Sequence, residues 1–213
     1  RRSGENGQDG TGGGCGATER GAGSLQGPTG GSGIVLLSYV CPPEWCPPLL
    51  DSYGTGGTVS RANGYVTHVF RSSGSFSLIH GATLEISSLL LVGGGGGCAY
   101  GTYHGGGGGA GGLVLASSRT ARAGETYEVV VGMGGSGAGS MAGRPSNGGD
   151  TSAFGLKAIG GGHGGGYDSG ASGSGYYGAD GGSAGGNMAY HTASPASSTQ
   201  DKYESMTGVE GYG

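Results

Sequence analysis

Apolar residues occur in short runs in which polar and apolar positions alternate, and glycine-rich stretches separate these runs. The alternation is clearest in YVTHVF, residues 65–70, and related runs occupy residues 34–40, 75–79, 83–92, 113–117, 125–131 and, more weakly, 151–159. A period of two is typical of strands with one buried face. No window places apolar residues at helical spacing without a glycine or β-branched interruption, so essentially no α-helix is expected. Short strands bounded by Gly, Ser and Asn predict an all-β sandwich around one modest core.

Glycine fills the segments between these runs: 59 of the 213 residues are glycine, roughly four times the usual share of about 7%. The glycine-rich segments are residues 7–33, 93–112, 132–149 and 160–187. As Gly/Ser linkers they would be random coil, although several structureless loops longer than about 12–15 residues are unusual in one compact domain. Alternatively they are left-handed polyglycine II helices with three residues per turn, whose amides only a neighbouring helix can satisfy and whose contacts side chains would block. The intervening strands favour an ordered polyglycine II bundle inserted into the sandwich.

Charge excludes several classes of partner. The formal net charge is −4 and only 11% of residues are charged, so neither a basic nucleic-acid footprint nor a charged solvating tail is present. No stretch of eighteen apolar residues exists that could span a membrane. The first ten residues, RRSGENGQDG, lack the apolar middle of a secretory signal. A signal already removed and a segment of a longer chain both remain open.

The four cysteines and two Pro-Pro pairs indicate how the chain is divided. Residues 41–52, CPPEWCPPLLDS, form a stiff connector because proline fixes φ and removes amide donors; it separates residues 1–40 from residues 53–213. Cys41 and Cys46 either close a small loop in it or are independent thiols. We expect Cys15 to pair with Cys98, because two cysteine-bearing glycine segments of one bundle could be cross-linked side by side. Four cysteines and few lysines favour an oxidising, extracellular or cell- or virion-surface setting.

No motif predicts catalysis, a cofactor or a metal. LLLVGGGGG, residues 89–97, resembles the strand-to-glycine turn of a dinucleotide fold, but no helix follows it, and no phosphate-loop motif exists. Cys98 and His104 lack a third, orienting residue. Asp150 is expected to hydrogen-bond a turn. The histidines have no metal-ligand spacing and are interpreted as surface residues: His68, His80, His104, His163 and His191.

Tyrosines in or beside the glycine segments are the remaining candidates for recognition. At loop tips they could contact a receptor or a glycan; structurally, they could simply wall off the edges of the bundle, which is the interpretation we favour. The candidates for tip contacts are Tyr100, Tyr103, Tyr176 and Tyr177, and Tyr167 and Tyr190 lie in similar surroundings.

The order of segments across residues 69–166 resembles a known family. VFRSSGSFSL, LEISSLLLVGGGGG, HGGGGGAGGLVLASS, ETYEVVVGMGGSG and NGGDTSAFGLKAIGGGHGGG follow one another there. This order resembles the glycine-rich domain of bacteriophage tail and bacterial surface-appendage proteins. It is also similar to the glycine-rich ectodomain of anaplastic lymphoma kinase and leukocyte tyrosine kinase receptors. The resemblance implies a jelly-roll-like sandwich whose strands emit polyglycine helices packed in a hexagonal array, and it brings no catalytic motif.

One element is displaced relative to that family. Its domains typically end in glycine-rich sequence followed by a strand like GGSGIVLLSYV, which here comes first, at residues 30–40. Residues 1–40 therefore resemble the closing part of such a domain, and residues 53–213 its opening part. Either the chain is one repeat of a tandem array, or the strand inserts into an adjacent subunit, or it pairs within its own domain. The residues that would form the assembly strand are Ile34, Val35, Leu36, Leu37 and Tyr39.

These observations predict a non-enzymatic, repeating subunit of an extracellular fibre that polymerises head to tail with copies of itself through its N-terminal segment. The alternative is a tail-fibre or cell-surface adhesin that binds a receptor or glycan through its tyrosine-bearing tips.

Overall fold

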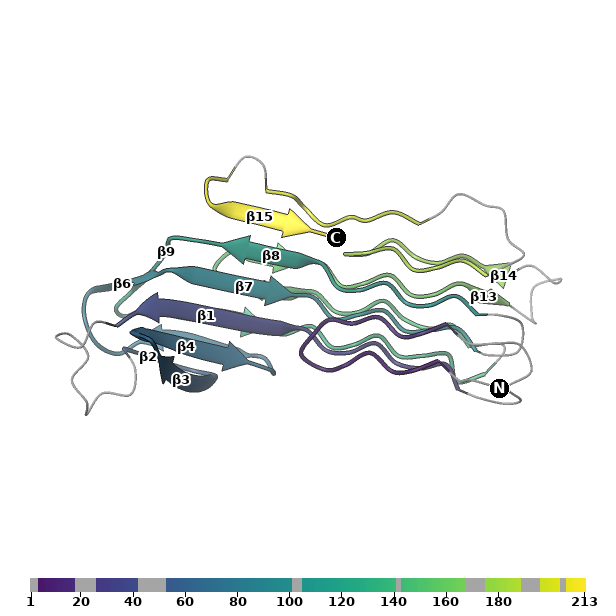
Figure 1. Cartoon of the computed structure of the whole chain (residues 1–213), viewed down its shortest axis with the longest axis horizontal. Coiled ribbons are helices and arrows are strands. Elements are labelled where there is room, and N and C mark those ends of the chain that lie inside the picture. Colours follow the sequence, from purple (N-terminus) through teal and green to yellow (C-terminus); the bar gives the residue numbers. More distant parts are fainter. Residues whose placement is uncertain are drawn as a thin grey trace.

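Most of the strands lie at one end of the molecule, and the glycine segments fill the other (Figure 1). The computed structural model describes residues 4–17, 26–41, 53–100, 105–140, 143–167, 175–188, 196–203 and 206–213. Every regular element in these ranges is a β-strand. All labelled strands except β13 and β14 gather at one end, and the glycine segments extend side by side along the long axis from there (Figure 1). The predicted all-β class is confirmed.

The larger sheet has six antiparallel strands, and the first strand of the chain lies in its interior. Its order is β15-β8-β7-β1-β4-β3. β1 (Ile34–Val40) is hydrogen-bonded on one side to β4 (Tyr65–Phe70) and on the other to β7 (Ser88–Val92). The edge strands are β15 (Val209–Tyr212) and β3 (Thr58–Ala62), and β8 (Leu113–Ala116) lies between β15 and β7.

The second sheet has five strands in the order β12-β11-β10-β5-β2. Its members are β12 (Leu156–Ala158), β11 (Thr151–Ala153), β10 (Thr126–Val130), β5 (Gly74–Leu78) and β2 (Gly54–Thr55). Two small two-stranded sheets complete the described elements: β6 (Thr83–Ile86) with β9 (Arg119–Arg122), and β13 (Gly166–Tyr167) with β14 (Gly175–Tyr176).

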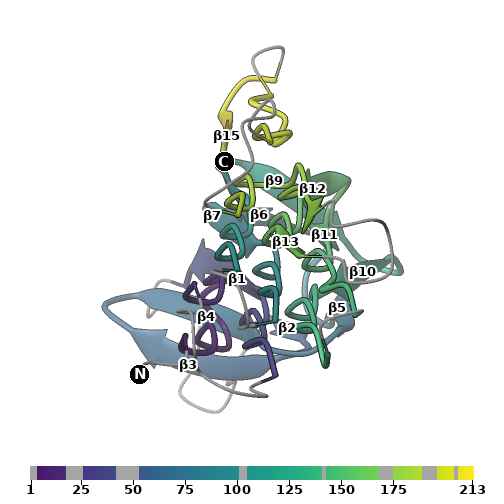
Figure 2. The same cartoon turned by 90° about the vertical axis from the view of Figure 1, so that its right-hand side faces the viewer.

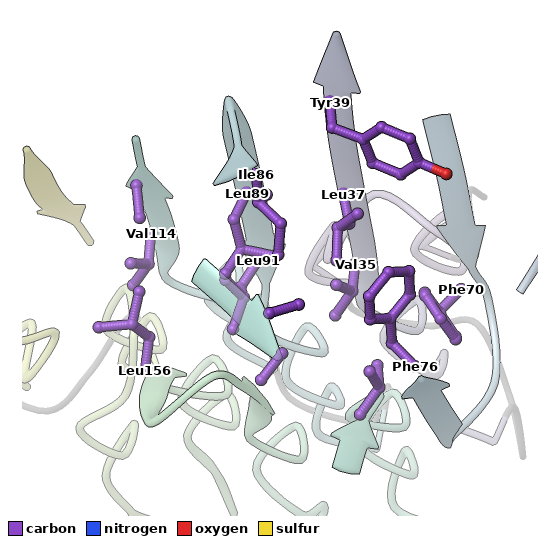
Figure 3. Close-up of a cluster of buried hydrophobic side chains, with 14 of the residues drawn as sticks. Val35, Leu37, Tyr39, Phe70, Phe76, Ile86, Leu89, Leu91, Val114 and Leu156 are labelled. Carbon is purple, nitrogen blue, oxygen red and sulfur yellow. The ribbon is translucent and has the colours of Figure 1, made fainter. Parts of the chain in front are cut away.

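The two large sheets enclose one hydrophobic core (Figure 3). Alternate residues of β1 enter it, and Val35, Leu37 and Tyr39 are fully buried. Phe76 from β5 packs against them from the opposite sheet. Each large apolar side chain buried in this way contributes about 1.5–3 kcal/mol. β1 is therefore integral to the core.

Two predicted strands are each divided in two. Residues 83–92 form β6 and β7, which part at Ser87, where the backbone N–H turns to donate to the Ser38 carbonyl at 2.9 Å. Residues 151–159 form the hairpin β11–β12, whose turn has positive φ at both Phe154 (50°) and Gly155 (74°). Both positions of a type I′ turn require positive φ, which phenylalanine rarely adopts. The sequence therefore lacked the usual Asn-Gly indication of a turn.

The expectation that all histidines are surface residues is wrong for His68, which is fully buried. Its Nδ1 lies 2.7 Å from the carbonyl oxygen of Gly56, and its Nε2 lies 3.3 Å from the hydroxyl of Tyr39. That hydroxyl also accepts the N–H of Tyr53 at 2.9 Å. This pattern fits a neutral ring that donates from Nδ1 and accepts at Nε2. Burial lowers the pKa of His68, and the hydrogen bond to Gly56 partly offsets this.

Candidate structural site in the glycine segments

The glycine run that follows β7 is bonded to three other segments with a repeat of three residues. The amides of Gly93 and Gly96 donate to Gly112 and Gly109, at 2.9 and 2.8 Å. The amides of residues 94 and 97 donate to residues 149 and 146, and the amides of residues 95 and 98 donate to residues 31 and 28. Since the partner numbers fall as the donor numbers rise, all three partner segments run antiparallel to residues 93–98.

The carbonyl groups of the same run accept from three further segments. Gly94 and Gly97 accept from Gly161 and Gly164, at 2.8 and 2.9 Å. Residues 95 and 98 accept from residues 135 and 138, and residue 96 accepts from Cys15 at 3.4 Å. In the first two cases both numbers rise together, so these segments run parallel to residues 93–98. Within the described residues, the central run therefore has six hydrogen-bonded neighbours.

Those six neighbours form a closed ring around residues 93–98. Each is hydrogen-bonded to the next: Gly109 to Gly162, Gly148 to Gly161, Gly149 to Met133, Gly30 to Gly135, Gly31 to Gly13, and Gly111 to Gly12, at 2.7–2.9 Å. Seen end-on, the segments are separate coils packed side by side (Figure 2). We call these seven segments the glycine array: residues 12–17, 27–33, 93–98, 106–112, 132–138, 146–149 and 159–165.

Close packing explains why the centre of the array is glycine. A Cβ atom added at any residue from Gly93 to Gly97 would lie 2.1–2.3 Å from a carbonyl oxygen of a neighbouring segment. These oxygens belong to three ring segments: residue 13 to 12–17, residues 133 and 136 to 132–138, and residues 159 and 162 to 159–165. Since the neighbours approach from several sides, no side chain fits at any of the five positions.

A disulfide fastens the N-terminal segment to the central run. Cys15 and Cys98 are bonded, with sulfur atoms 2.03 Å apart and a sequence separation of 83 residues. Both cysteines are buried. The predicted pairing is confirmed, and a disulfide is typical of an oxidising compartment.

Comparison with known protein families identifies the larger part of the chain. Residues 71–213 match the family model described as a glycine-rich domain. This chain belongs to the glycine-rich domain family. No curated protein and no solved structure matches it. The matched region of the glycine-rich domain begins after β4, so it leaves out β1 together with the first two segments of the array.

Polar side chains satisfy backbone groups where the glycine segments meet the strands. The buried hydroxyl of Thr151 accepts the N–H of Gly132 at 2.9 Å. The buried side chain of Gln200 accepts the N–H of Ile159 at 2.7 Å and donates to the carbonyl of Lys157 at 3.1 Å. Sequence analysis missed both residues, because a Thr or Gln beside glycine carries no distinctive pattern.

Asp150 has the kind of role that its sequence context predicts. One carboxylate oxygen accepts the N–H of Gly160 at 2.9 Å, and the other lies 3.0 Å from the ammonium group of Lys157. Both partners belong to the β11–β12 hairpin or to the segment that leaves it, so Asp150 holds the hairpin to the array.

The tyrosine candidates differ in exposure. Tyr176 is buried, with the guanidinium of Arg144 lying 5.2 Å from the centre of its ring. Tyr177 is 49% exposed, and Tyr100 is half-buried. Tyr103 lies outside the described residues, and so does Cys46 of the connector, whereas Cys41 is described and buried. Of these two neighbouring tyrosines, Tyr176 is therefore buried and Tyr177 is exposed.

The assembly-strand residues all lie on β1, where Leu36 is half-buried and Ile34 is buried beside the three core residues. Within the described ranges, no group of three or more His, Cys, Asp or Glu side chains could hold a metal ion. The same residues include no helix long and apolar enough to cross a membrane.

Proposed function

We propose that this glycine-rich domain is a non-enzymatic structural subunit of an extracellular fibre, and that it polymerises head to tail through residues 1–40. In this proposal the glycine array is a polyglycine II bundle that forms a stiff rod on a jelly-roll-like sandwich. Residues 41–52 connect the donated segment to the body of the subunit, residues 53–213.

The three-residue repeat of hydrogen-bond partners supports the polyglycine II assignment. A helix of this type turns once every three residues and makes no internal hydrogen bonds, so its amides and carbonyls must bond to neighbours in directions that repeat every third residue. Residues 93–98 have such a pattern toward five segments, and one further bond joins them to a sixth. All six amides of this run and the carbonyls of residues 94–98 are bonded, which offsets the large entropy that glycine loses on ordering.

The position of β1 supports head-to-tail donation. In this structure β1 pairs with β4 and β7 of its own chain, which is the third of the arrangements considered from the sequence. The connector separates β1 in sequence from both strands, and a second copy, which carries the same β4 and β7, would offer β1 the same pairing. Residues 12–17 and 27–33 precede β1 and complete the ring of the array. Donation of the whole segment would therefore preserve all the strand pairs and the array contacts while linking one subunit to the next.

The disulfide provides a direct test, because Cys15 belongs to the donated segment and Cys98 to the body. If the segment is donated, this bond joins consecutive subunits. Denaturing electrophoresis without reductant should then give a ladder of covalent multimers that collapses to monomer with reductant. Electron microscopy of the same material should show filaments with a regular axial repeat. A single monomer band without reductant, together with isolated globules, would refute the proposal.

Exposed Tyr177 supports one alternative, an adhesin that binds a receptor or glycan through the tips of its glycine segments. A monomeric protein that binds a glycan array, and loses binding on Tyr177→Ala, would favour this function over the fibre.

A further inference from the structure

Residues 106–112 use only part of the hydrogen-bonding capacity that a segment of the array can have. Their backbone groups fall into six rows, each containing the same group at every third residue. Two amide rows donate hydrogen bonds: amides 106, 109 and 112 to residues 159–165, and amides 108 and 111 to residues 12–17. Two carbonyl rows accept hydrogen bonds: carbonyls 109 and 112 from residues 93–98, and carbonyls 107 and 110 from residues 183–186.

Two rows of this segment have no partner among the described residues. They are the amides of Gly107 and Ala110, and the carbonyls of Gly108 and Gly111. Ala110 is exposed and the three glycines are half-buried, so both rows face solvent. The unpaired groups keep the three-residue spacing of the bonded ones.

The order of donors and acceptors places the two open rows side by side. Around the central run, neighbours that receive and neighbours that donate a hydrogen bond alternate strictly. Around residues 106–112 the same alternation runs through the four bonded neighbours, from residues 12–17 to residues 183–186. If the alternation continues, the neighbour next to residues 183–186 must accept hydrogen bonds, which the open amides of Gly107 and Ala110 can donate. The neighbour next to residues 12–17 must donate hydrogen bonds, which the open carbonyls of Gly108 and Gly111 can accept.

We infer that this face binds the glycine segments of a second copy of the chain, which extend the glycine array sideways across the subunit boundary. Residues 12–17 supply complementary rows, since neither the amides nor the carbonyls of Gly14 and Ala17 have a partner in the described part of the chain. An incoming segment needs little or no side chain, as at Gly93–Gly97. A second copy meets that requirement with the same spacing and chemistry.

The inferred contact is directional. Within the array, the hydrogen bonds that link residues 93–98 to each ring segment run one way, from donor row to acceptor row. A donor row on one copy therefore needs an acceptor row on the next, and residues 106–112 and 12–17 together present rows of both kinds. This lateral contact is separate from head-to-tail donation, because it leaves β1 and the disulfide unchanged.

Ala110→Lys tests the inference, because residue 110 belongs to an open row and is exposed, so a long charged side chain there would obstruct an incoming segment. Ala82→Lys is the matched control: it adds the same charge at an exposed alanine at the strand end of the molecule. Sedimentation velocity over a concentration series measures self-association, and thermal melting confirms that both variants fold. Losing even one or two hydrogen bonds from the contact should weaken association about tenfold. Ala82→Lys should associate like the wild type.

Amide exchange on the wild-type protein supplies a readout that needs no variant. The amides of Gly107 and Ala110 should exchange rapidly in dilute monomer and become protected on association. If filaments form, Ala110→Lys should yield single filaments where the wild type gives bundles. Rapid exchange at both amides in the associated state, or equal association of Ala110→Lys and the wild type, would overturn the inference, whether or not the head-to-tail proposal holds.

Discussion

Adding a single methyl group at the centre of the glycine array should destabilise the protein severely. In Gly95→Ala the new Cβ would lie 2.1 Å from the carbonyl oxygen of Gly13 and 2.4 Å from its carbon. Contact between nonbonded heavy atoms begins at about 3.5 Å, so residues 12–17 would have to move away by about 1 Å. The hydrogen bond from Gly31 to Gly13, now 2.9 Å long, would be broken.

The size of the effect follows from three terms. Overpacking costs about 1–3 kcal/mol, and losing a buried backbone hydrogen bond costs about 1–3 kcal/mol. Replacing glycine reduces the entropy of the unfolded chain and returns about 0.4–1 kcal/mol. The net loss is about 3 kcal/mol, which for a chain of this size lowers the Tm by roughly 10 °C.

Gly186→Ala is the matched control. Gly186 is also hydrogen-bonded through both its amide and its carbonyl, to Gly107 and Gly165 at 2.9 and 2.8 Å. It is exposed, and an added Cβ would lie no closer than 3.5 Å to any other atom outside its chain neighbours. In dilute solution its Tm should be unchanged or slightly raised. Equal melting temperatures for the two alanine variants would refute the packing argument.

Three further changes test the polar contacts. Burial lowers the pKa of His68 below its ordinary value of 6.5, so His68 of the unfolded chain takes up a proton at a higher pH than His68 of the folded chain. The free energy of unfolding should therefore fall as the pH drops below about 6.5, by at most about 1.4 kcal/mol per pH unit. Tm measured from pH 8 to 5 should show this fall, and His68→Gln should remove that component. Thr151→Val leaves the N–H of Gly132 without its partner and should cost about 1–3 kcal/mol in denaturant unfolding, whereas Thr151→Ser should retain most of the stability. Gln200→Ala removes the acceptor of the partly buried N–H of Ile159 and should cost about 1 kcal/mol or more. A loss below about 0.5 kcal/mol in either the valine or the alanine variant would contradict the assigned hydrogen bonds.

The sequence predicted the strands whose alternation is strong and missed those whose side chains are exposed. Residues 65–70 and 34–40 were predicted as strands because every second side chain enters the core. β3 was missed because all five of its residues are exposed, so no alternation marks it. The short β9 and β15 were missed as well. Edge strands of this kind depend on their hydrogen-bonded neighbour, which one sequence does not reveal.

The candidate site was predictable in kind but not in its connections. Adjacent cysteine-bearing glycine segments led to the Cys15–Cys98 pair, which the structure contains. Which glycine faces which neighbour depends on the relative shift of several segments, and glycine has no side chain to record it. The burial of His68 was missed because its partners, Tyr39 and Gly56, are brought to it only by the pairing of β1 with β4 and the turn before β3.

Residue-resolved amide exchange tests the central claim, that the glycine segments are a packed, hydrogen-bonded structure. The amides of Gly94–Gly97 should be protected to a degree comparable with the β1 core strand, because each is buried and bonded to a neighbouring segment. Gly139, which is exposed and has open space around its Cα, should exchange rapidly. Rapid exchange throughout residues 93–112 and the described part of residues 160–187, with protected strands, would contradict the account and support flexible linkers instead.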